Sequence, residues 1–344
     1  MNRRNFLKKA VPAGVVLPSM ISGFSMKAYG ASHMLSALTA AGTETDHVLV
    51  LVQLTGGNDG LNTIIPLDQY EGLAAARGNI LLPQKKILSL STTTGIHPAM
   101  SGMHKLYNDE KLQVIQSVGY PQPNFSHFRA TDIWMSASDS DQIVSSGWMG
   151  RYLGEEYTNF PVQFPNTVMP DPLAIQIGSF ISPVLQGPSV SMGMAISDPV
   201  NFYNLVSGIQ TPAPNTNAGK ELTYIRQISQ QTQKYAQVIK DAAGKVTRQG
   251  VYPANNSLAE QLKIVARLIA GGLKTRVYMV SIGSFDTHAK QVYENAKETG
   301  EHATLLMKTS DAIKAFMDDL KYLRVSQRVA GMTFSEFGRR IKSN

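Results

Sequence analysis

The fold is decided by the stretch Val48-Leu49-Val50-Leu51-Val52-Gln53-Leu54, followed at once by Thr55-Gly56-Gly57-Asn58-Asp59-Gly60. A short apolar run that a glycine-rich turn ends is typical of a strand buried on both faces of a parallel sheet. Functional loops of such sheets lie at the carboxyl ends of the strands. The sequence therefore predicts a buried parallel strand over 48–54 with a functional loop directly after it.

The same pattern recurs in three other segments. Residues 112–118, 276–282 and 328–334 are each predicted as a strand, and each is followed by a turn or a polar residue. Between the strands, apolar residues near a 3.6-residue period predict helices over 98–110, 126–138 and 299–323. Strands that alternate with helices predict an α/β fold, a doubly wound and mostly parallel sheet with helices on both faces.

The middle of the chain has a different composition and is predicted to be an insertion over about 160–256, after which the chain returns to the sheet. Its first part is rich in proline and aromatic residues, and no internal repeat is visible. The elements expected in and just after it are short strands at 174–178 and 189–196, a polar linker at 211–217, and helices at about 220–243 and 257–271.

The N-terminus has the features of an export signal. Arg3-Arg4-Asn5-Phe6-Leu7 precedes an uncharged stretch to residue 26, and Ala28-Tyr29-Gly30 supplies small residues for cleavage. This resembles a twin-arginine signal, and the alternative is a basic surface helix. We therefore expect a signal peptide over 1–30, a linker over 31–46 and a domain over 47–344. The twin-arginine translocase is then a partner, and the product is periplasmic or secreted.

Composition limits the classes of function. The chain of 344 residues is 43% hydrophobic and contains no cysteine, so disulfides and thiolate sites are excluded. No segment reaches the roughly 18–20 apolar residues of a stable membrane span. The signal holds five of the 32 Lys and Arg and none of the 25 Asp and Glu, so the rest of the chain is nearly neutral and no nucleic-acid partner is expected.

Acidic residues follow three of the predicted strands. Asp59, Asp286 and Glu336 should gather where the carboxyl ends of parallel strands meet. Asn58 and His288 add an amide oxygen and an imidazole, which a divalent metal accepts together with carboxylates. The predicted ligands are therefore Asp59, Asn58, Asp286, His288 and Glu336, with zinc as the first choice of metal and manganese or calcium as alternatives.

Each of these residues also has an ordinary structural interpretation. Asn58 and Asp59 are common in turns, and the Asp286-Thr287-His288 string is also explained by capping beside a surface histidine. Glu336 is equally consistent with a solvated charge balanced by Arg339 or Arg340. His97 and His104 have no comparable placement after a strand and are predicted to be structural.

Ser126 is a candidate nucleophile because it stands at the predicted start of a helix, where free N–H groups and the helix dipole favour an anion. Arg129 is one turn further on and could bind a phosphate or sulfate oxygen. The alternative is that Ser126 or Asn124 is a helix cap and that Arg129 pairs with a surface carboxylate.

Several strings taken in order resemble family 1501 of the domains of unknown function, an exported family grouped with alkaline phosphatases and sulfatases. The resemblance runs from about residue 47 to the end of the chain, with a divergent middle. The strings are LTGGNDGLNTIIP (54–66), HPAM (97–100), VGYPQPNFSHFRATDIW (118–134), GWMGR (147–151), FDTH (285–288) and TFSEFGRR (333–340).

The resemblance implies an alkaline phosphatase-like fold and a role for each matching residue. Asp59 matches the metal carboxylate after the first strand, and Ser126 matches the nucleophile at the helix start. Asp286, His288 and Glu336 stand where later metal ligands are expected. Members of the family normally continue past this last motif to an Asp-His-Gly segment, so the resemblance also implies that the chain is C-terminally truncated.

Together these observations predict an exported metal-dependent hydrolase of phosphate or sulfate esters, acting on a small molecule or a polymer. A rival is a non-catalytic exported binding or assembly protein on the same fold. A third possibility is an inactive truncated fragment.

Overall fold

The computed structural model describes residues 20–21, 24–25, 46–199, 216 and 234–343. The predicted linker at 31–46, most of the predicted signal peptide, the polar linker at 211–217 and the first half of the helix predicted at 220–243 lie almost entirely outside these residues. In the signal region the description covers only β1 (Met20–Ile21) and β2 (Phe24–Ser25), which pair antiparallel.

The fold is an α/β fold built on a five-stranded parallel sheet with the strand order β10-β3-β9-β7-β8. The strands predicted at 48–54, 276–282 and 328–334 are confirmed at its centre and at one edge. Because all five strands are parallel, their carboxyl ends lie along one border of the sheet, which is called its carboxyl edge below. The strands are β3 (Val48–Leu54), β7 (Ala174–Ile177), β8 (Gly193–Ile196), β9 (Val277–Ile282) and β10 (Val329–Phe334).

The prediction of a strand at 112–118 is wrong. These residues form no strand, and Ile115 and Val118 are largely exposed at the surface. Ser117 adopts a positive φ of 59°, which interrupts an extended chain. Polar residues alternate with the apolar ones here, so the segment lacks the continuous apolar run that buries the strands of the sheet.

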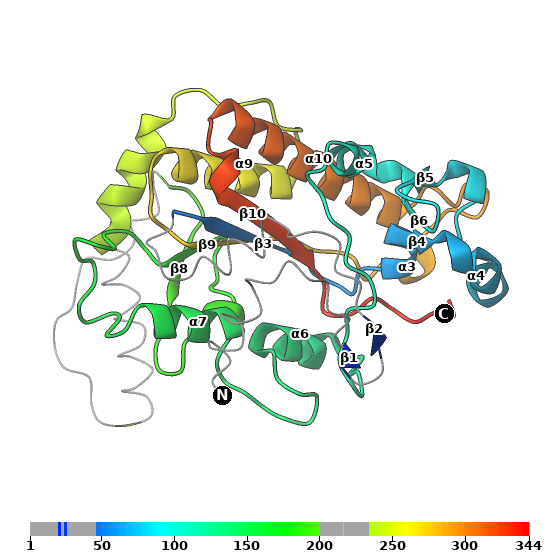
Figure 1. The fold of residues 1–344 in the computed structure, drawn as a ribbon, viewed down its shortest axis with the longest axis horizontal. Coiled ribbons are helices and arrows are strands. Elements are labelled where there is room, and N and C mark those ends of the chain that lie inside the picture. The colour runs from blue at the N-terminus through cyan, green and yellow to red at the C-terminus, as the bar shows by residue number, and fades with distance from the viewer. Residues whose placement is uncertain (1–19, 22–23, 26–45, 200–215, 217–233, 344) are drawn as a thin grey trace.

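Helices cover both faces of the sheet (Figure 1). On one face α9 and α10 pack together with α5 over the even-numbered side chains of β3, including Val48, Val50 and Val52. On the other face α6 and α7 contribute Met135, Met149 and Leu153 to a second core around Leu51. The helices are α5 (Ser101–Asn108), α6 (His127–Ser136), α7 (Trp148–Glu156), α9 (Ser257–Ala270) and α10 (Glu301–Tyr322), with a further helix at 234–245.

A small antiparallel sheet of order β4-β6-β5 lies beside α3 (Gly60–Thr63) and α4 (Tyr70–Arg77). Its strands are β4 (Ile64–Pro66), β5 (Leu88–Ser89) and β6 (Thr94–Ile96). Single 3-10 turns complete the described elements: η1 (Leu67–Gln69), η2 (Gln84–Lys86), η3 (Pro98–Met100), η4 (Pro183–Leu185), η6 (His288–Lys290) and η7 (Ser326–Arg328).

The segment predicted as an insertion contributes directly to the main sheet. The strands β7 and β8 come from it, and β7 pairs in parallel with β9. The composition differs here because the strands are short and proline-rich turns separate them. The side chains of β7 and β8 are nevertheless as buried as those of β3. In the part of the chain that the structure describes, no helix has the length and apolarity needed to cross a membrane.

His97 is buried and hydrogen-bonded, and its surroundings predict a pH dependence of the stability of the protein. Its imidazole is 1% exposed, and its Nδ1 accepts a hydrogen bond of 3.1 Å from the N–H of Ala99 at the start of η3. The pKa of His97 is lowered from 6.5 to about 3, chiefly by burial and also by the nearby His302, while Glu298 opposes the shift. The folded protein therefore keeps this ring neutral at pH values at which the unfolded chain protonates it.

Acidification is expected to remove the stability that neutral His97 contributes. The folded pKa lies below the unfolded one, so this stability is complete above pH 6.5 and falls as the pH approaches the folded value. Between pH 7 and pH 5 the loss should be about 2 kcal/mol. Urea unfolding of the wild type and of His97→Gln at the two pH values checks this, because the variant should lose less stability on acidification. An equal loss in both proteins would contradict the prediction.

Candidate active site at the carboxyl edge of the sheet

The loops after β3, β9 and β10 pack against one another, which brings the predicted site residues to one edge of the sheet. The N–H of Gly56 donates to Oε1 of Glu336 over 2.9 Å, and the N–H of Asn58 donates to Oγ of Ser335 over 2.9 Å. The backbone of Phe285 bonds to Thr55 on the other side. The loop after β3 is therefore held between the loops that follow its two neighbours, β10 and β9.

Gly56 makes this packing possible because any side chain would strike the neighbouring loop. Its φ is 119°, and a Cβ placed on it would lie 2.6 Å from the backbone nitrogen of Asp286. We expect Gly56→Ala to destabilise the fold by about 2 kcal/mol, since both strain and overlap with backbone are added.

Urea unfolding measures this effect, and Gly72→Ala is the matched control. Gly72 lies within α4, and a Cβ there would meet no atom within 4 Å. The control should gain about 0.5–1 kcal/mol from helix propensity. If Gly56→Ala proved as stable as the wild type, the loops would not be packed as described.

A cluster of charged side chains lies at this edge, with His127 at its centre. Nδ1 of His127 is 2.9 Å from Oε1 of Glu336, and its Nε2 is 3.6 Å from Oδ2 of Asp286. Nε2 of His288 is 2.7 Å from Oδ1 of Asp286, and a guanidinium nitrogen of Arg339 is 2.8 Å from the same oxygen. Glu336, Asp286 and His288 are therefore brought together as predicted, through contacts with His127 and Arg339.

The two carboxylates of the cluster are in different surroundings. Glu336 is buried, whereas the side chain of Asp286 is 42% exposed. Burial opposes ionisation of Asp286, but the hydrogen bond from Arg339 and the nearby His288 and His127 outweigh it and lower the pKa of this carboxyl. Asp286 is thus held as an anion at the mouth of the cluster, and Glu336 lies at its base.

Unusual backbone conformations surround Asp286. Ser284, His288 and Arg339 all have positive φ, at 74°, 41° and 63°. Each such residue costs on the order of 1 kcal/mol or more and persists only where the surrounding structure holds it. Residues of this kind gather at functional sites, which supports a functional role for this cluster.

Asp59 lies in the same region but its carboxylate is already paired. It is 1% exposed, forms an ion pair with Arg77, and accepts a bond of 2.5 Å from Nε2 of Gln291. The other oxygen accepts from the N–H of Asn62 at 3.3 Å, which makes Asp59 the N-cap of α3. Asp59 therefore has the capping role that was the alternative to metal binding. It also has a buried counter-ion, Arg77.

The amide oxygen of Asn58 faces away from the charged cluster. It is 2.9 Å from Nε2 of His302 and accepts a second bond of 3.1 Å from the hydroxyl of Thr63. Burial lowers the pKa of His302 to about 4, so its ring is neutral, and we infer that its Nε2 carries the proton donated to Asn58. With its oxygen used twice, Asn58 presents its amide nitrogen as the remaining polar group.

Ser126 is the N-cap of α6, immediately before His127, and its hydroxyl makes no capping hydrogen bond. The first N–H groups of the helix are left without intrahelical partners, as at any helix start. Arg129 does not face this group: its guanidinium donates to the carbonyl oxygens of Ser140 and Gln142, the first over 3.1 Å. It thereby holds the following loop, so the anion-binding role predicted for Arg129 is not what this geometry supports.

The donor types of the cluster suit a divalent metal, but their spacing does not form a metal site. Asp286, Glu336, His127 and His288 offer carboxylate oxygen and imidazole nitrogen, which zinc accepts. Among the described residues, however, no group of three or more His, Asp or Glu side chains is arranged to hold an ion. The residues present therefore fit a metal by chemistry and do not fit one by arrangement.

Four residues of the site were not predicted. His127 and Arg339 stand next to predicted residues in the strings around Ser126 and Glu336, so proximity in sequence was a usable signal. Arg77 and Gln291 pair with Asp59 from α4 and from the loop after η6. Nothing in their local sequence indicates this pairing, because it depends on how distant segments pack.

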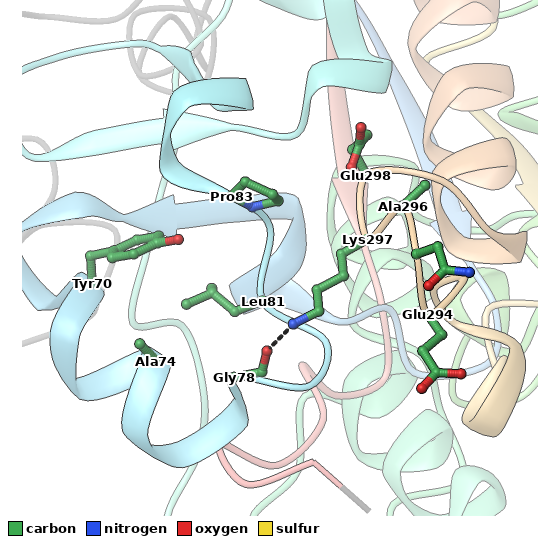
Figure 2. A pocket seen from close by; sticks show the side chains of 10 residues that line it. Tyr70, Ala74, Gly78, Leu81, Pro83, Glu294, Ala296, Lys297 and Glu298 are labelled. Atoms are coloured by element: carbon green, nitrogen blue, oxygen red, sulfur yellow. Dashed lines mark hydrogen bonds between the residues drawn. The ribbon is translucent and has the colours of Figure 1, made fainter.

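A separate cleft of about 330 Å³ lies between α4 and the loop 294–298 (Figure 2). Lys297 reaches across it, and its ammonium donates to the carbonyl oxygen of Gly78. None of the predicted site residues lines this cleft. The cleft shares α4 with Arg77, and the bond from Lys297 joins Gly78, the C-cap of this helix, to the loop 294–298.

The chain matches no protein-family model, no curated protein and no solved structure in the comparisons made with each. The resemblance to family 1501 of the domains of unknown function therefore stays a prediction that rests on the quoted strings.

Proposed function

We propose that this protein is an exported hydrolase of phosphate or sulfate esters with an alkaline phosphatase-like doubly wound fold, and that Ser126 is its nucleophile. The single observation that supports the proposal most is the position of His127, whose ring contacts both Asp286 and Glu336. Ser126 directly precedes His127 at the start of α6, and its hydroxyl makes no capping hydrogen bond, which leaves this oxygen available for the proposed role.

The residues of the chain have complementary roles in this proposal. The exposed N–H groups at the start of α6 and the guanidinium of Arg339 attract the anionic ester. Oγ of Ser126 forms a bond to phosphorus or sulfur while the bond to the leaving oxygen breaks. The hydroxyl proton is lost to water, the leaving alkoxide takes up a proton, and a water molecule later releases Ser126.

A divalent metal, with zinc as the first choice and manganese or calcium as alternatives, is part of the proposal on the strength of donor chemistry alone. Asp286, His288 and Glu336, with His127 as a further donor, would hold it only after the side chains of the cluster rearrange. When bound, such a metal lowers the pKa of a hydroxyl and neutralises developing negative charge. Asp59 and Asn58 would contribute only after release from Arg77 and His302.

The test combines metal analysis with an ester assay on the full chain. Purified protein is loaded with zinc, manganese or calcium, its metal content is measured, and aryl phosphates and aryl sulfates are assayed with and without a chelator. The proposal expects bound metal near one ion per chain or more, and turnover that the chelator abolishes. A folded chain that binds none of these metals and turns over none of these esters would overturn it.

One observation favours the rival class, a non-catalytic exported binding or assembly protein. The charge of Asp59 is neutralised by Arg77, and within the described residues no three His, Asp or Glu side chains are arranged to hold an ion. A folded, metal-free and inactive chain in the assay above is the result that this rival expects.

A further inference from the structure

An aromatic wall adjoins the charged cluster directly. The ring of Phe337 lies 4.8 Å from the ring of His127 and 6.1 Å from the ring of Phe125, measured between centroids. The ring of His127 therefore contacts both the carboxylates of Asp286 and Glu336 and the apolar ring of Phe337. Phe125, Phe337 and His127 together are called the aromatic wall below.

The wall is held in place by its contact with Gly57. A Cβ built on this residue, whose φ is 70°, would lie 2.2 Å from Cε2 of Phe337, so only glycine allows the ring to sit here. Phe337 is therefore fixed against the loop after β3 and is half-buried. Phe125 rests on the edge of this ring and keeps 48% of its own surface exposed.

Exposed aromatic surface flanks the proposed nucleophile in sequence as well. Phe125 and Phe128 stand on either side of Ser126 and His127, and Phe128 is 88% exposed. The guanidinium of Arg340 lies 5.1 Å from the ring centroid of Phe125, which adds a cation beside the wall. Large apolar side chains left exposed next to a functional site are typical of a surface that binds a ligand.

We propose, resting on the proposed function, that the ester taken by this site carries an aromatic group that packs on the aromatic wall. The substrate class is thus an aryl phosphate or aryl sulfate, with its anionic end at Ser126 and its ring against Phe125. Aromatic pairs contribute enough to favour a larger ring by about threefold to tenfold. An alkyl or sugar ester would leave Phe125 exposed and would not gain the contribution of an aromatic contact.

The experiment compares 2-naphthyl phosphate with phenyl phosphate, and the matching sulfates, on the full chain. The two phenols are of similar acidity, so a difference in kcat/KM reports the contact with the ring and not the reactivity of the ester. The wild type should prefer the naphthyl ester by about threefold to tenfold. Phe125→Ala should bring the ratio close to one, because its ring supplies the exposed part of the wall.

Tyr322→Ala is the matched control. Tyr322 is 60% exposed at the end of α10, just before the amino end of β10, and so lies at the opposite edge of the sheet. This variant should keep the wild-type ratio. The ratio in the wild type is itself decisive, so the test holds even if Phe125→Ala does not fold.

A binding measurement separates the two proposals. Naphthyl and phenyl phosphonates, which are not hydrolysed, are titrated calorimetrically into the same proteins. If esters are turned over with a naphthyl-to-phenyl ratio of kcat/KM near one, the aromatic preference is overturned and the proposed hydrolase function still stands. No turnover of any ester, together with tighter binding of the naphthyl phosphonate that Phe125→Ala removes, supports the wall and overturns the hydrolase. If neither turnover nor a binding preference is found, both proposals fail.

Discussion

Replacing Ser126 with alanine is expected to lower kcat/KM for ester hydrolysis by about 10³-fold or more, the scale on which the loss of a nucleophile acts. The physical reason is that the covalent step needs the oxygen of Ser126, and the helix N–H groups that attract the ester cannot replace it. Steady-state kinetics on an aryl phosphate and an aryl sulfate measure the change.

Stability separates a chemical role of Ser126 from a structural one. Because the hydroxyl is exposed and makes no capping hydrogen bond, the substitution should change the free energy of unfolding by no more than about 0.5 kcal/mol. Ser140→Ala is the matched control, since it removes another surface hydroxyl, one that donates to the carbonyl oxygen of Pro121 over 3.2 Å. The control should keep full activity. Undiminished turnover in Ser126→Ala would remove Ser126 from the mechanism.

Replacing Arg77 with methionine is expected to destabilise the fold by about 3–5 kcal/mol, because it leaves the charge of Asp59 buried without a counter-ion. Both partners are 1% exposed, so water cannot take the place of the guanidinium. Within the described structure Nε and Nη1 of Arg77 have no hydrogen-bond partner. The buried guanidinium therefore depends on its contact with Asp59. Urea unfolding measures the loss.

Two further variants make this prediction specific. Lys314→Met breaks an ion pair whose Asp318 partner is 62% exposed, and this should cost only about 0.3–0.5 kcal/mol. Combining Arg77→Met with Asp59→Asn should recover part of the loss, because the buried group is then an uncharged amide. If Arg77→Met cost no more than Lys314→Met, the buried pair would not be the contact that fixes α4 to the loop after β3.

Much of the fold could be predicted because it depends on local apolar patterns. The continuous run at 48–54 can be buried only in a two-sided layer, and β3 is an interior strand between β10 and β9. The failure at 112–118 has the same physical basis, since alternating polar residues and the positive φ of Ser117 leave that segment at the surface. The strands β7 and β8 were expected from the sequence, whereas their place in the main sheet was not.

The apolar runs in the chain are sufficient to predict the parallel sheet and the edge at which Asp59, Asp286 and Glu336 gather, because strand direction places every carboxyl end on the same side. The partner that each of these side chains has depends on how the helices and loops pack. Asp59 pairs with Arg77 from α4, Glu336 with His127 from α6, and Arg129 with a loop instead of the site. The physical reason is that apolar periodicity acts within each segment, while the pairing of charges depends on short distances between segments that only packing sets.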